Sequence, residues 1–588
     1  MYAGLLPVIG KDDTDLGSLF FWMFSARTPQ KIPKLVFWLN GGPGCSSMDG
    51  LFLENGPFIP TDKGKSLAIR NASWYHDATI VYVDQPVGTG YSHVASKSGG
   101  KKNDGFMYSL TDVAASFRAF LDRWLLVFSD LAGSEVYIAG ESYAGQYLPY
   151  IAKNILSTTS SSTTTINLKG MLIGNGWMDP HRQYLSFVEY GLQNNLISGQ
   201  YLKSAITNAN SCKKKYESST TQTIKSSFCE GIMDSILNNS TATGEKYCLN
   251  MYDIRLNDDT EEGACGLYSW PPNLNEMKSY LGRADVKAAV HVPNNGQDAK
   301  WEECNGDVHS ALSRNNQDPP SFLLFEGILE RIPVLLFKYA LFAGDMDLIC
   351  NWIGIYDMVE NMSWNGAKGM KNAPKQDWFI DSQLQGWYQT SRNLTYVLKY
   401  NASHMMPVDS PIAASDMFNR FIGVDTRDPL DTFVGTFIDS EPVVVTTSSA
   451  IATTTVKPVE VEDFVTAIPF VPAVGDDLEG VVGGGVENTE MESEDDAASF
   501  GAGAFFLIAI ILGIVGYLVY QANRTRLAKF FGGPPHNRRG GSRSHEWMEL
   551  NATGDGDEDG GSVMEDDELD AMLELESGPS SGRKRVNN

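Results

Sequence analysis

The sequence predicts an α/β fold with a mostly parallel central sheet. Runs rich in β-branched and aromatic residues recur along roughly the first two thirds of the chain, a stretch of helical apolar spacing lies between two of them, and several runs end in glycine-rich or polar turns. Strands that alternate with helices indicate a parallel sheet covered on both faces. Such a sheet binds its ligand beyond the carboxyl ends of its strands, so the turns there are the candidate functional positions.

The predicted elements can be placed in chain order. We expect a helix at 107–127 and strands at 19–24, 34–39, 78–83, 135–139, 168–173, 334–342 and 394–400. Between about residues 180 and 320 the strand pattern gives way to helical and polar pieces that hold five of the seven cysteines. This part is interpreted as a helical, disulfide-bearing cap insertion, within one domain at 1–438.

The turn at Ser142 is the strongest local feature. Residues 140–144 (Gly-Glu-Ser-Tyr-Ala) follow an expected strand, and small residues on both sides of a serine suit a strained turn from a strand into a helix. This geometry exposes one hydroxyl at the top of the sheet, as in the nucleophile elbow of α/β-hydrolases, with Ala144 in the place of the usual second glycine. The pattern therefore predicts an α/β-hydrolase fold with Ser142 as the nucleophile.

Two later strand ends supply the partners that a serine nucleophile needs. An acidic turn follows the sixth expected strand, where Asp345 and Asp347 are both candidates, and His404 follows the seventh. A hydroxyl is a weak nucleophile until an imidazole accepts its proton, and a carboxylate holds that imidazole in the required tautomer. The chain order Ser, Asp, His is the one used by α/β-hydrolases. The glycine-rich turn at 40–44 follows another strand and exposes the N–H groups of half an oxyanion hole.

The bulk composition excludes nucleic acid as a partner. The chain has 588 residues, 42% of them hydrophobic, and a formal net charge of −26. Phosphate backbones are bound by Lys and Arg, which are outnumbered here. Part of the acidity lies in C-terminal runs that we expect to be disordered. We expect neither a metal nor an organic cofactor.

Cysteines and glycosylation sequons indicate an oxidising lumen. The seven cysteines allow three disulfides with one thiol left over. The candidate N-glycosylation sites are Asn71, Asn238, Asn239, Asn361, Asn393 and Asn401. The first residues lack the basic and apolar regions of a signal peptide, so no entry signal is visible in this sequence.

The C-terminal part changes character in three steps. Residues 439–499 are rich in Val, Thr, Pro, Glu and Gly and predict a disordered stalk. Residues 500–520 are uncharged and apolar over the roughly 20 residues that a bilayer requires, so we expect one transmembrane helix. Arg524, Arg526 and Lys529 follow it, which places the acidic tail at 521–588 in the cytosol and the large domain in a lumen or outside the cell. The tail is a candidate binding segment for sorting machinery.

Four blocks of the sequence resemble the signature blocks of the serine carboxypeptidase family. They lie at 38–47 (WLNGGPGCSS), 140–147 (GESYAGQY), 344–351 (GDMDLICN) and 404–407 (HMMP), and the match spans about residues 1–425. The stalk, span and acidic tail are similar to those of the fungal members that process pheromones and prohormones in the late Golgi. The resemblance implies a single-pass type I enzyme of the trans-Golgi network that removes C-terminal residues, preferentially Lys or Arg, from propeptides.

The resemblance also implies a role for each residue of the site. It selects Asp347 over Asp345 as the orienting acid, because the family's acid stands three residues before the cysteine, with Ser142 as nucleophile and His404 as base. It implies an oxyanion hole built from the backbone N–H groups of Gly42 and Tyr143. The residues implied to bind the substrate's terminal carboxylate are Asn40, Gly41, Glu54 and Glu141.

The two acids in the carboxylate-binding group lead to an expectation about pH. Crowded carboxylates do not all ionise at low cost, so a proton is shared and one pKa rises. A protonated Glu54 or Glu141 donates a hydrogen bond to the substrate's carboxylate, whereas an ionised one repels it. We therefore expect activity to fall as the pH rises.

The family's cysteine pairing implies three disulfides and one free thiol. The pairs are Cys45–Cys304, Cys212–Cys229 and Cys248–Cys265, and Cys350 is left free near the triad, where a mercurial would test it. Two positions beside His404 depart from the family pattern: Ser403 stands where many relatives have glycine, and a glycan on Asn401 would lie close to the site. The family's opening segment is not visible in this sequence.

Two other functions stay open. Some members of the family are acyltransferases, which pass the acyl group to an alcohol instead of water, although the stalked and anchored architecture favours a peptidase. A binding receptor in the lumen on an inactive hydrolase scaffold is the other alternative, and the presence of all three triad positions argues against it.

Overall fold

The structure is a computed structural model that describes residues 1–424 and 563–564. Within the first range it leaves out 10–14, 29, 96–104, 158–163, 220–221, 242–246, 260–269, 293–300, 316–317 and 332–337. The expected stalk at 439–499 and span at 500–520 lie outside the described residues, as does nearly all of the tail. In the part that is described, no helix is both long enough and apolar enough to cross a membrane.

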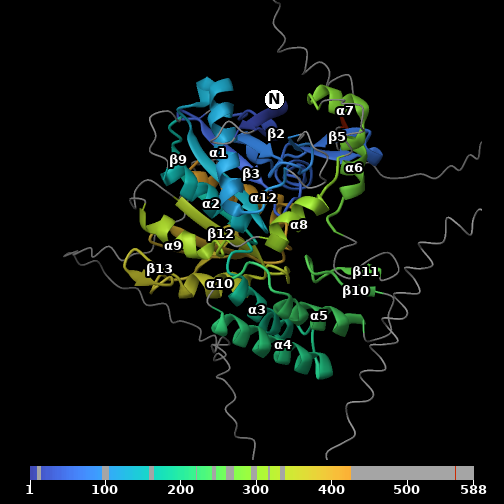
Figure 1. The fold of residues 1–588 in the computed structure, drawn as a ribbon, viewed down its shortest axis with the longest axis vertical. Coiled ribbons are helices and arrows are strands. Elements are labelled where there is room, and N and C mark those ends of the chain that lie inside the picture. The colour runs from blue at the N-terminus through green and yellow to red at the C-terminus, as the bar shows by residue number, and fades with distance from the viewer. Residues whose placement is uncertain are drawn as a thin grey trace, which may run out of the picture. The chain divides into compact units, whose positions relative to one another are not determined.

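A mixed sheet of eleven strands forms the centre of the domain (Figure 1). Its order is β1 (Tyr2–Ile9), β2 (Asp15–Phe24), β6 (Thr79–Val83), β3 (Lys34–Leu39), β8 (Glu135–Glu141), β9 (Leu168–Gly174), β12 (Lys338–Gly344), β17 (Leu394–Lys399), β16 (Gln383–Ser391) and β15 (Gln376–Ile380), with β7 (His93–Val94) paired to β2. The six strands from β6 to β17 are mutually parallel, and antiparallel strands complete both edges. The carboxyl ends of the six parallel strands therefore meet at one edge of the sheet.

The parallel strands are buried on both faces, which explains their nearly continuous apolar sequences. Each of the seven expected strands has a counterpart, namely β2, β3, β6, β8, β9, β12 and β17. β12 is described from Lys338 to Gly344 where we expected 334–342, and 332–337 lie outside the described residues. The helix expected at 107–127 begins at 110, because Ser109 caps it by accepting a hydrogen bond from Asp112 N.

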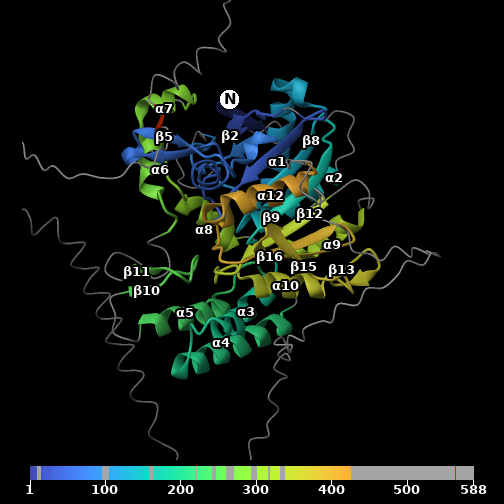
Figure 2. The ribbon, with the colours of Figure 1, turned by 180° about the vertical axis from the view of Figure 1, so that it is seen from behind.

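Helices cover the two faces of the sheet. On one face, a single hydrophobic cluster joins the sheet to α1 (Leu110–Val127), α2 (Ala144–Ser157), α9 (Phe322–Arg331) and α10 (Trp352–Asn361). On the other face, a second cluster joins it to α12 (Pro411–Ile422), α6 (Leu274–Gly282) and α7 (Ala284–Ala289). Figures 1 and 2 show α1 and α12 on these opposite sides.

The expected insertion consists of two parts. The helices α3 (Pro180–Gln193), α4 (Gly199–Ser218) and α5 (Ser227–Thr241) pack around a hydrophobic core of their own, and the disulfide Cys212–Cys229 joins α4 to α5. After the hairpin of β10 (Tyr247–Leu249) and β11 (Asn257–Asp259), the chain returns to the sheet domain through α6, α7 and α8 (Gly306–Asn315). Only the first part thus forms a separate helical layer (Figure 1).

The remaining elements are short. They are η1 (Gly50–Glu54), η2 (Asp62–Gly64), η3 (Trp74–His76), η4 (Ser129–Leu131), α11 (Met406–Asp409), the hairpin of β13 (Ser363–Trp364) and β14 (Ala367–Lys368), and the small sheet of β4 (Phe58–Thr61), β5 (Ser66–Ile69) and β18 (Val563–Met564). Among these, η1 and α11 flank the edge of the sheet where the parallel strands end, and both bear on the site.

Candidate active site

Ser142 lies at a strained turn between β8 and α2. Its φ of 60° is in the left-handed region, which costs energy for a residue other than glycine. Backbone hydrogen bonds fix the turn, because Ser142 N donates to Gly174 O and Ser142 O accepts from Trp177 N. A Cβ on Gly140 would lie 2.1 Å from Leu39 O and 2.8 Å from the Cβ of Ala144. The turn therefore requires a small residue on each side of the serine, as the sequence pattern indicated.

The glycine-rich turn after β3 lies directly against Ser142 and Tyr143. A Cβ on Gly41 would come within 2.4 Å of Tyr143 N, so only glycine allows this approach. Gly42 has a φ of 107°, which glycine alone adopts without strain. The backbone N–H groups of Gly42 and Tyr143, the expected oxyanion hole, are thereby held on neighbouring segments.

His404 and Asp347 form a buried imidazole–carboxylate pair. Nδ1 of His404 lies 2.7 Å from Oδ2 of Asp347, and the two side chains are 2% and 0% exposed. Asp347 also accepts hydrogen bonds from Asn175 Nδ2 at 2.7 Å and from Cys350 N at 3.2 Å. With Nδ1 committed to the carboxylate, Nε2 is the nitrogen available to accept a proton.

Asp345, the other candidate acid, has a different position. Its Oδ1 accepts a hydrogen bond from Ala402 N at 3.2 Å, and its backbone carbonyl accepts one from the hydroxyl of Tyr190 at 2.7 Å. The structure thus pairs His404 with Asp347 and assigns Asp345 to the turn that precedes the histidine.

Aromatic rings from the insertion enclose the imidazole. The rings of Tyr252 and Trp270 stack on each other, with centroids 4.8 Å apart, and lie 5.0 and 5.9 Å from the ring of His404. The backbone is also fixed, because His404 N donates to Tyr252 O at 3.0 Å. These contacts limit rotation of the imidazole and shield the imidazole–carboxylate pair from water.

Three of the four residues expected to bind a carboxylate are joined through one amide. Nδ2 of Asn40 donates to Glu54 Oε1 and to Glu141 Oε1, both at 3.1 Å. The amide is held in turn by Trp38 Nε1 and Gly50 N, which both donate to its Oδ1. The other carboxyl oxygens, Glu54 Oε2 and Glu141 Oε2, are buried and reach no donor in the described chain. A proton carried by one carboxyl supplies the missing donor.

Burial dominates the electrostatics of these two acids. It raises the pKa of Glu54, and hydrogen bonds with Glu141 and Asn40 lower that pKa in part. Burial also raises the pKa of Glu141 well above its ordinary value, and the charge of Glu54 raises it further. Both carboxyls therefore resist ionisation, and the pair keeps a proton to a higher pH than an exposed glutamic acid does.

A cavity of about 740 Å³ opens beside these groups. Its lining includes Ser142, Tyr143, His404, Asn40 and Glu141, together with Gly41 and Gly42. Residues of α5, Trp177 after β9 and Trp270 of the insertion form other parts of its wall. The expected nucleophile, base, oxyanion-hole residues and carboxylate-binding groups therefore face one space, except Glu54, which lies fully buried behind Asn40.

Two of the expected disulfides are present in full, Cys45–Cys304 and Cys212–Cys229. Cys248 is also disulfide-bonded, but Cys265 lies outside the described residues. Cys350 is a free, buried thiol on the cavity wall. Burial and the charge of Asp347 raise its pKa well above the ordinary value, so it is a neutral thiol at neutral pH.

One group of side chains near the triad resembles a set of metal ligands. Ligand atoms of Asp347, Cys350 and His404 lie within 4.8 Å of one another. A thiol with a raised pKa resists the deprotonation that metal binding requires, and His404 Nδ1 is already bonded to Asp347. These residues fit a hydrogen-bonded pair with a neighbouring thiol better than a metal centre.

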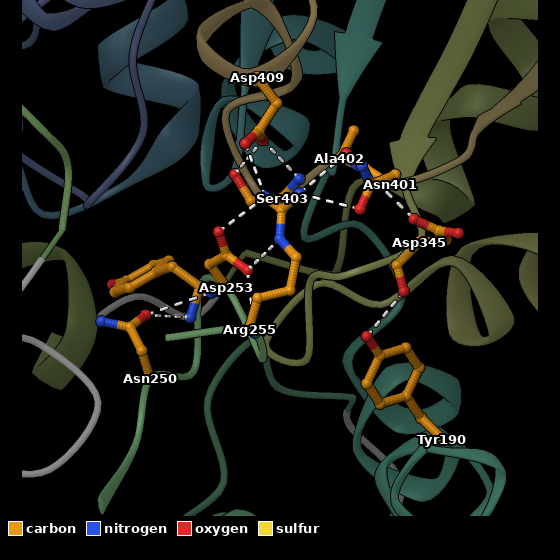
Figure 3. Close-up of polar contacts among 10 residues, drawn as sticks. Tyr190, Asn250, Asp253, Arg255, Asp345, Asn401, Ala402, Ser403 and Asp409 are labelled. Atoms are coloured by element: carbon orange, nitrogen blue, oxygen red, sulfur yellow. Dashed lines mark hydrogen bonds and ion pairs between the residues drawn. The ribbon is translucent and has the colours of Figure 1, made fainter. Parts of the chain in front are cut away.

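Arg255 connects the insertion to the turn that carries His404 (Figure 3). Its guanidinium binds Asp253, from the same loop, through Nε and Nη2 at 2.8 and 2.7 Å. It also donates through Nη2 to Asp409 at 2.6 Å and through Nη1 to the carbonyl of Asn401 at 3.0 Å. Asp409 accepts two further hydrogen bonds, from the N–H and the hydroxyl of Ser403. Ser403, which departs from the pattern that the family resemblance implies, is therefore part of this network.

The expected glycosylation sites differ in their exposure and in the contacts of their amides. Asn71 and Asn238 are exposed. The amides of Asn239 and Asn361 donate to backbone carbonyls, those of Leu196 and Asp357. Asn393 is half-buried, and Asn401 is exposed and accepts a hydrogen bond from Arg255.

The sequence did not indicate several residues that support the pair His404–Asp347. Asn175 directly follows β9, and its position as a polar residue at the end of a strand is a sequence feature that could have marked it as part of the site. Tyr252, Trp270 and Arg255 lie in the insertion, and no local pattern marks them.

The fold and the site define an α/β-hydrolase with a serine at the elbow and a buried imidazole–carboxylate pair. Comparison with known proteins is consistent with this class. A profile of the serine carboxypeptidase family matches residues 1–424. The chain belongs to the serine carboxypeptidase family.

The more similar relatives are fungal. The chain is 42% identical over 437 residues to a pheromone-processing carboxypeptidase kex1 of Pyrenophora tritici-repentis, and the match covers 72% of this chain and 65% of that relative. It is 41% identical over 436 residues to the protein of the same name from Aspergillus niger, covering 72% of this chain and 68% of the relative. The chain thus spans about two thirds of the length of these curated relatives.

A solved structure is also similar. The crystal structure of Kex1Δp, a prohormone-processing carboxypeptidase from Saccharomyces cerevisiae, superposes with a TM-score of 0.64 at 33% sequence identity. The match covers 72% of this chain and 90% of that chain. The likeness therefore extends over the whole α/β domain.

Proposed function

We propose that this protein is a serine carboxypeptidase that releases residues one at a time from the free carboxyl end of peptides and propeptides. The observation that carries the proposal is the group Asn40–Glu54–Glu141, which meets the cavity of Ser142 and His404. An ordinary serine hydrolase has no need of two buried acids beside its nucleophile. A peptidase that reads a terminal carboxylate needs a donor there, and a protonated Glu141 provides one.

The geometry suits an acyl-enzyme mechanism. Ser142 Oγ attacks the last peptide carbonyl while its proton passes to Nε2 of His404, and Asp347 stabilises the imidazolium through Nδ1. The N–H groups of Gly42 and Tyr143 bind the oxyanion. The C–N bond then breaks, His404 returns the proton to the leaving amine, and the free amino acid departs. Water, deprotonated by His404, hydrolyses the ester on Ser142 and restores the enzyme.

We further propose a preference for C-terminal Lys and Arg, and a location in the trans-Golgi network. The names of the relatives, which are pheromone- and prohormone-processing carboxypeptidases, support processing of propeptides. The apolar segment 500–520 and the basic residues after it support a type I membrane anchor with the catalytic domain in the lumen. The acidic tail would then be free to bind sorting proteins in the cytosol.

The free carboxylate provides the direct test of the proposed function. Purified protein is incubated with matched peptides that end in a free acid or in a carboxamide, and released amino acids are measured. We expect the free-acid peptide to be cleaved with a kcat/KM at least ~100-fold higher, because the amide lacks the charge that the acidic group must recognise. Equal cleavage of both peptides would show a general hydrolase, and transfer to an added alcohol without release to water would show an acyltransferase.

The pH dependence gives a second, independent prediction. As the pH rises, ionisation of Glu141 removes the donor and adds a repelling charge, so kcat/KM for free-acid peptides should fall on the alkaline side. In Glu141→Gln the donor persists at every pH, so the alkaline fall should shift or flatten. A profile for the wild type that rises to a plateau above neutral pH would contradict the proposed proton.

The stability of the fold should also decrease as the pH rises. The folded chain keeps protons on Glu54 and Glu141 that the unfolded chain releases above about pH 4.3. The free energy of unfolding contributed by these groups is therefore highest below that pH and is lost as the pH rises through their raised pKa values. Thermal unfolding at each pH, measured beside the kinetics, separates loss of fold from loss of the donor.

A further inference from the structure

The loop at 250–255 of the insertion is bonded to the turn that carries Asp347. Three backbone hydrogen bonds join the two segments: Leu348 N and Ile349 N donate to Met251 O at 3.2 and 3.1 Å, and Ile254 N donates to Met346 O at 3.0 Å. The residues immediately before and after the acid are therefore both held by the loop. The proposed mechanism assigns no role to this loop.

The same loop is also bonded to the turn that carries His404. The carbonyl of Tyr252 accepts a hydrogen bond from His404 N at 3.0 Å. Nη1 of Arg255 donates to the backbone carbonyl of Asn401 at 3.0 Å and to its Oδ1 at 3.2 Å. The loop is thus a bridge between the turn of the acid and the turn of the base, which follow β12 and β17.

Side chains fix the shape of this bridge. Oδ1 of Asn250 accepts hydrogen bonds from Tyr252 N and Asp253 N at 2.9 and 3.2 Å. Nδ2 of Asn250 donates to Asp258 Oδ1 at 3.0 Å, and Oδ1 of Asp253 accepts from Arg255 N at 3.0 Å. Asn250 and Asp253 are buried, so water competes little for these bonds. A displacement at one end of the loop is therefore passed on to the other.

Arg255 connects the loop to the residues on both sides of the base. Its guanidinium lies between Asp253 and Asp409 (Figure 3). Nε and Nη2 donate to the two oxygens of Asp253 at 2.8 and 2.7 Å, and Nη2 also donates to Oδ1 of Asp409 at 2.6 Å. Oδ2 of Asp409 accepts from the N–H and the hydroxyl of Ser403, which directly precedes His404.

The charges explain why one guanidinium can hold this arrangement. Hydrogen bonds between ionised groups are stronger than those between neutral groups, and the planar fork of an arginine also fixes their direction. Asp253 and Asp409 are 6% and 18% exposed, whereas Arg255 is 31% exposed. Removal of the guanidinium would leave two poorly hydrated carboxylates without their shared cation. The loop and the turn of His404 would then shift relative to each other.

We propose that Arg255 is a positioning residue. Its bonds to Asp253 and Asp409 fix the loop at 250–255 between the two turns and thereby hold the pair His404–Asp347 in its reactive alignment. This inference rests on the proposed function, in which that pair activates Ser142.

The first test compares Arg255→Ala with Arg283→Ala on a free-acid peptide. We expect Arg255→Ala to lower kcat by ~10- to 100-fold, because a small misplacement of the reacting groups has an effect of this size. The inhibition constant of a non-cleavable peptide should change by less than about threefold, because Arg255 contacts the catalytic turns and not the groups around Asn40.

Arg283 is a matched control on another part of the domain. It makes the same kind of fork, to Asp285 at 3.1 and 2.6 Å, and donates to the carbonyl of Lys65 at 2.9 Å. Its side chain is 26% exposed, close to the value for Arg255. Arg283→Ala should leave kcat within about twofold of the wild-type value.

The second test asks whether the missing group can be supplied again. Guanidinium at low millimolar concentration is added to Arg255→Ala, with sodium chloride at the same concentration as the salt control. We expect kcat to rise several-fold with guanidinium alone, because the ion can bind between Asp253 and Asp409. Arg255→Lys should have an intermediate kcat, since an ammonium cannot reproduce the fork. Neither the wild type nor Arg283→Ala should gain activity.

The outcomes separate this role from the proposed function. A wild type that releases no residue from any free-acid peptide would refute the function itself. If the wild type is active, an unchanged kcat in Arg255→Ala, or an equal loss in Arg283→Ala, would overturn the role of Arg255. So would a loss that neither guanidinium nor lysine restores, because that result indicates damaged packing.

Thermal unfolding shows whether each variant is folded. Should Arg255→Ala not fold, Arg255→Lys and Asp409→Asn carry the test. Each is expected to lower kcat several-fold, and the double variant should lose less than the product of the two losses, because both changes break the same contact. Independent losses that multiply would contradict the proposal.

Discussion

Replacing Ser142 by alanine is expected to lower the release of C-terminal residues by about 10⁴-fold or more, because the variant has no hydroxyl to form the acyl-enzyme. Binding should persist, since the groups around Asn40 are untouched. Release of amino acids from free-acid peptides measures the rate, and inhibition by a non-cleavable peptide measures the binding.

Ser157→Ala is a suitable control for this prediction. Ser157 ends the same helix α2, is exposed, and donates to the carbonyl of Asn154. Its replacement should leave the rate of release within about twofold of the wild-type rate, as is usual for an exposed position. Activity of Ser142→Ala close to that of Ser157→Ala would remove the nucleophile from the proposed mechanism.

Replacing Asp347 by asparagine should cause a loss of similar size, about 10⁴-fold in kcat. An asparagine amide at this position donates a hydrogen bond to Nδ1 of His404, which forces the proton onto Nε2, the nitrogen that must accept the proton of Ser142. The remaining oxygen of the asparagine still accepts from the N–H of Cys350, whereas the amide of Asn175 loses its acceptor and must turn away. Rates of peptide hydrolysis and of Ser142 labelling should fall together.

Asp345→Asn is the matched control for the acid. The amide oxygen of an asparagine still accepts the hydrogen bond from Ala402 N, so the turn before His404 is retained. We expect a loss of less than about tenfold, caused by small shifts of that turn. Equal losses in the two variants would mean that the turn, and not the pair His404–Asp347, limits the reaction.

Local patterns predicted the parallel core and the family well. The strands β3, β6, β8 and β17 are buried along nearly their whole length, so their apolar runs are easy to recognise. The edge strands β15 and β1 alternate buried with exposed or half-buried residues, and they were missed. The expected transmembrane helix at 500–520 lies outside the described residues and stays a prediction.

The site contains contacts that sequence patterns do not reveal. Residue order and local pattern indicated Ser142 and His404, and the family resemblance selected Asp347 over Asp345; their roles stay predictions, although the structure pairs Asp347 with His404. The contacts of Asp347 with Asn175 and of Arg255 with Asp409 join residues 172 and 154 positions apart. Such partners are fixed by tertiary packing, and a single sequence contains no periodic pattern that reveals them.

The contacts of Arg255 limit how the insertion can be shortened or exchanged. The guanidinium of Arg255 joins the loop after β10 to Asn401 and Asp409, which lie on either side of His404 in the sequence. The insertion as a whole is therefore not a separable module whose removal would simply open the entrance to the cavity. Shortening the insertion or exchanging it between relatives would also free the turn that carries His404, so grafts that aim to change access should keep the loop at 250–255 and Asp409 as one unit.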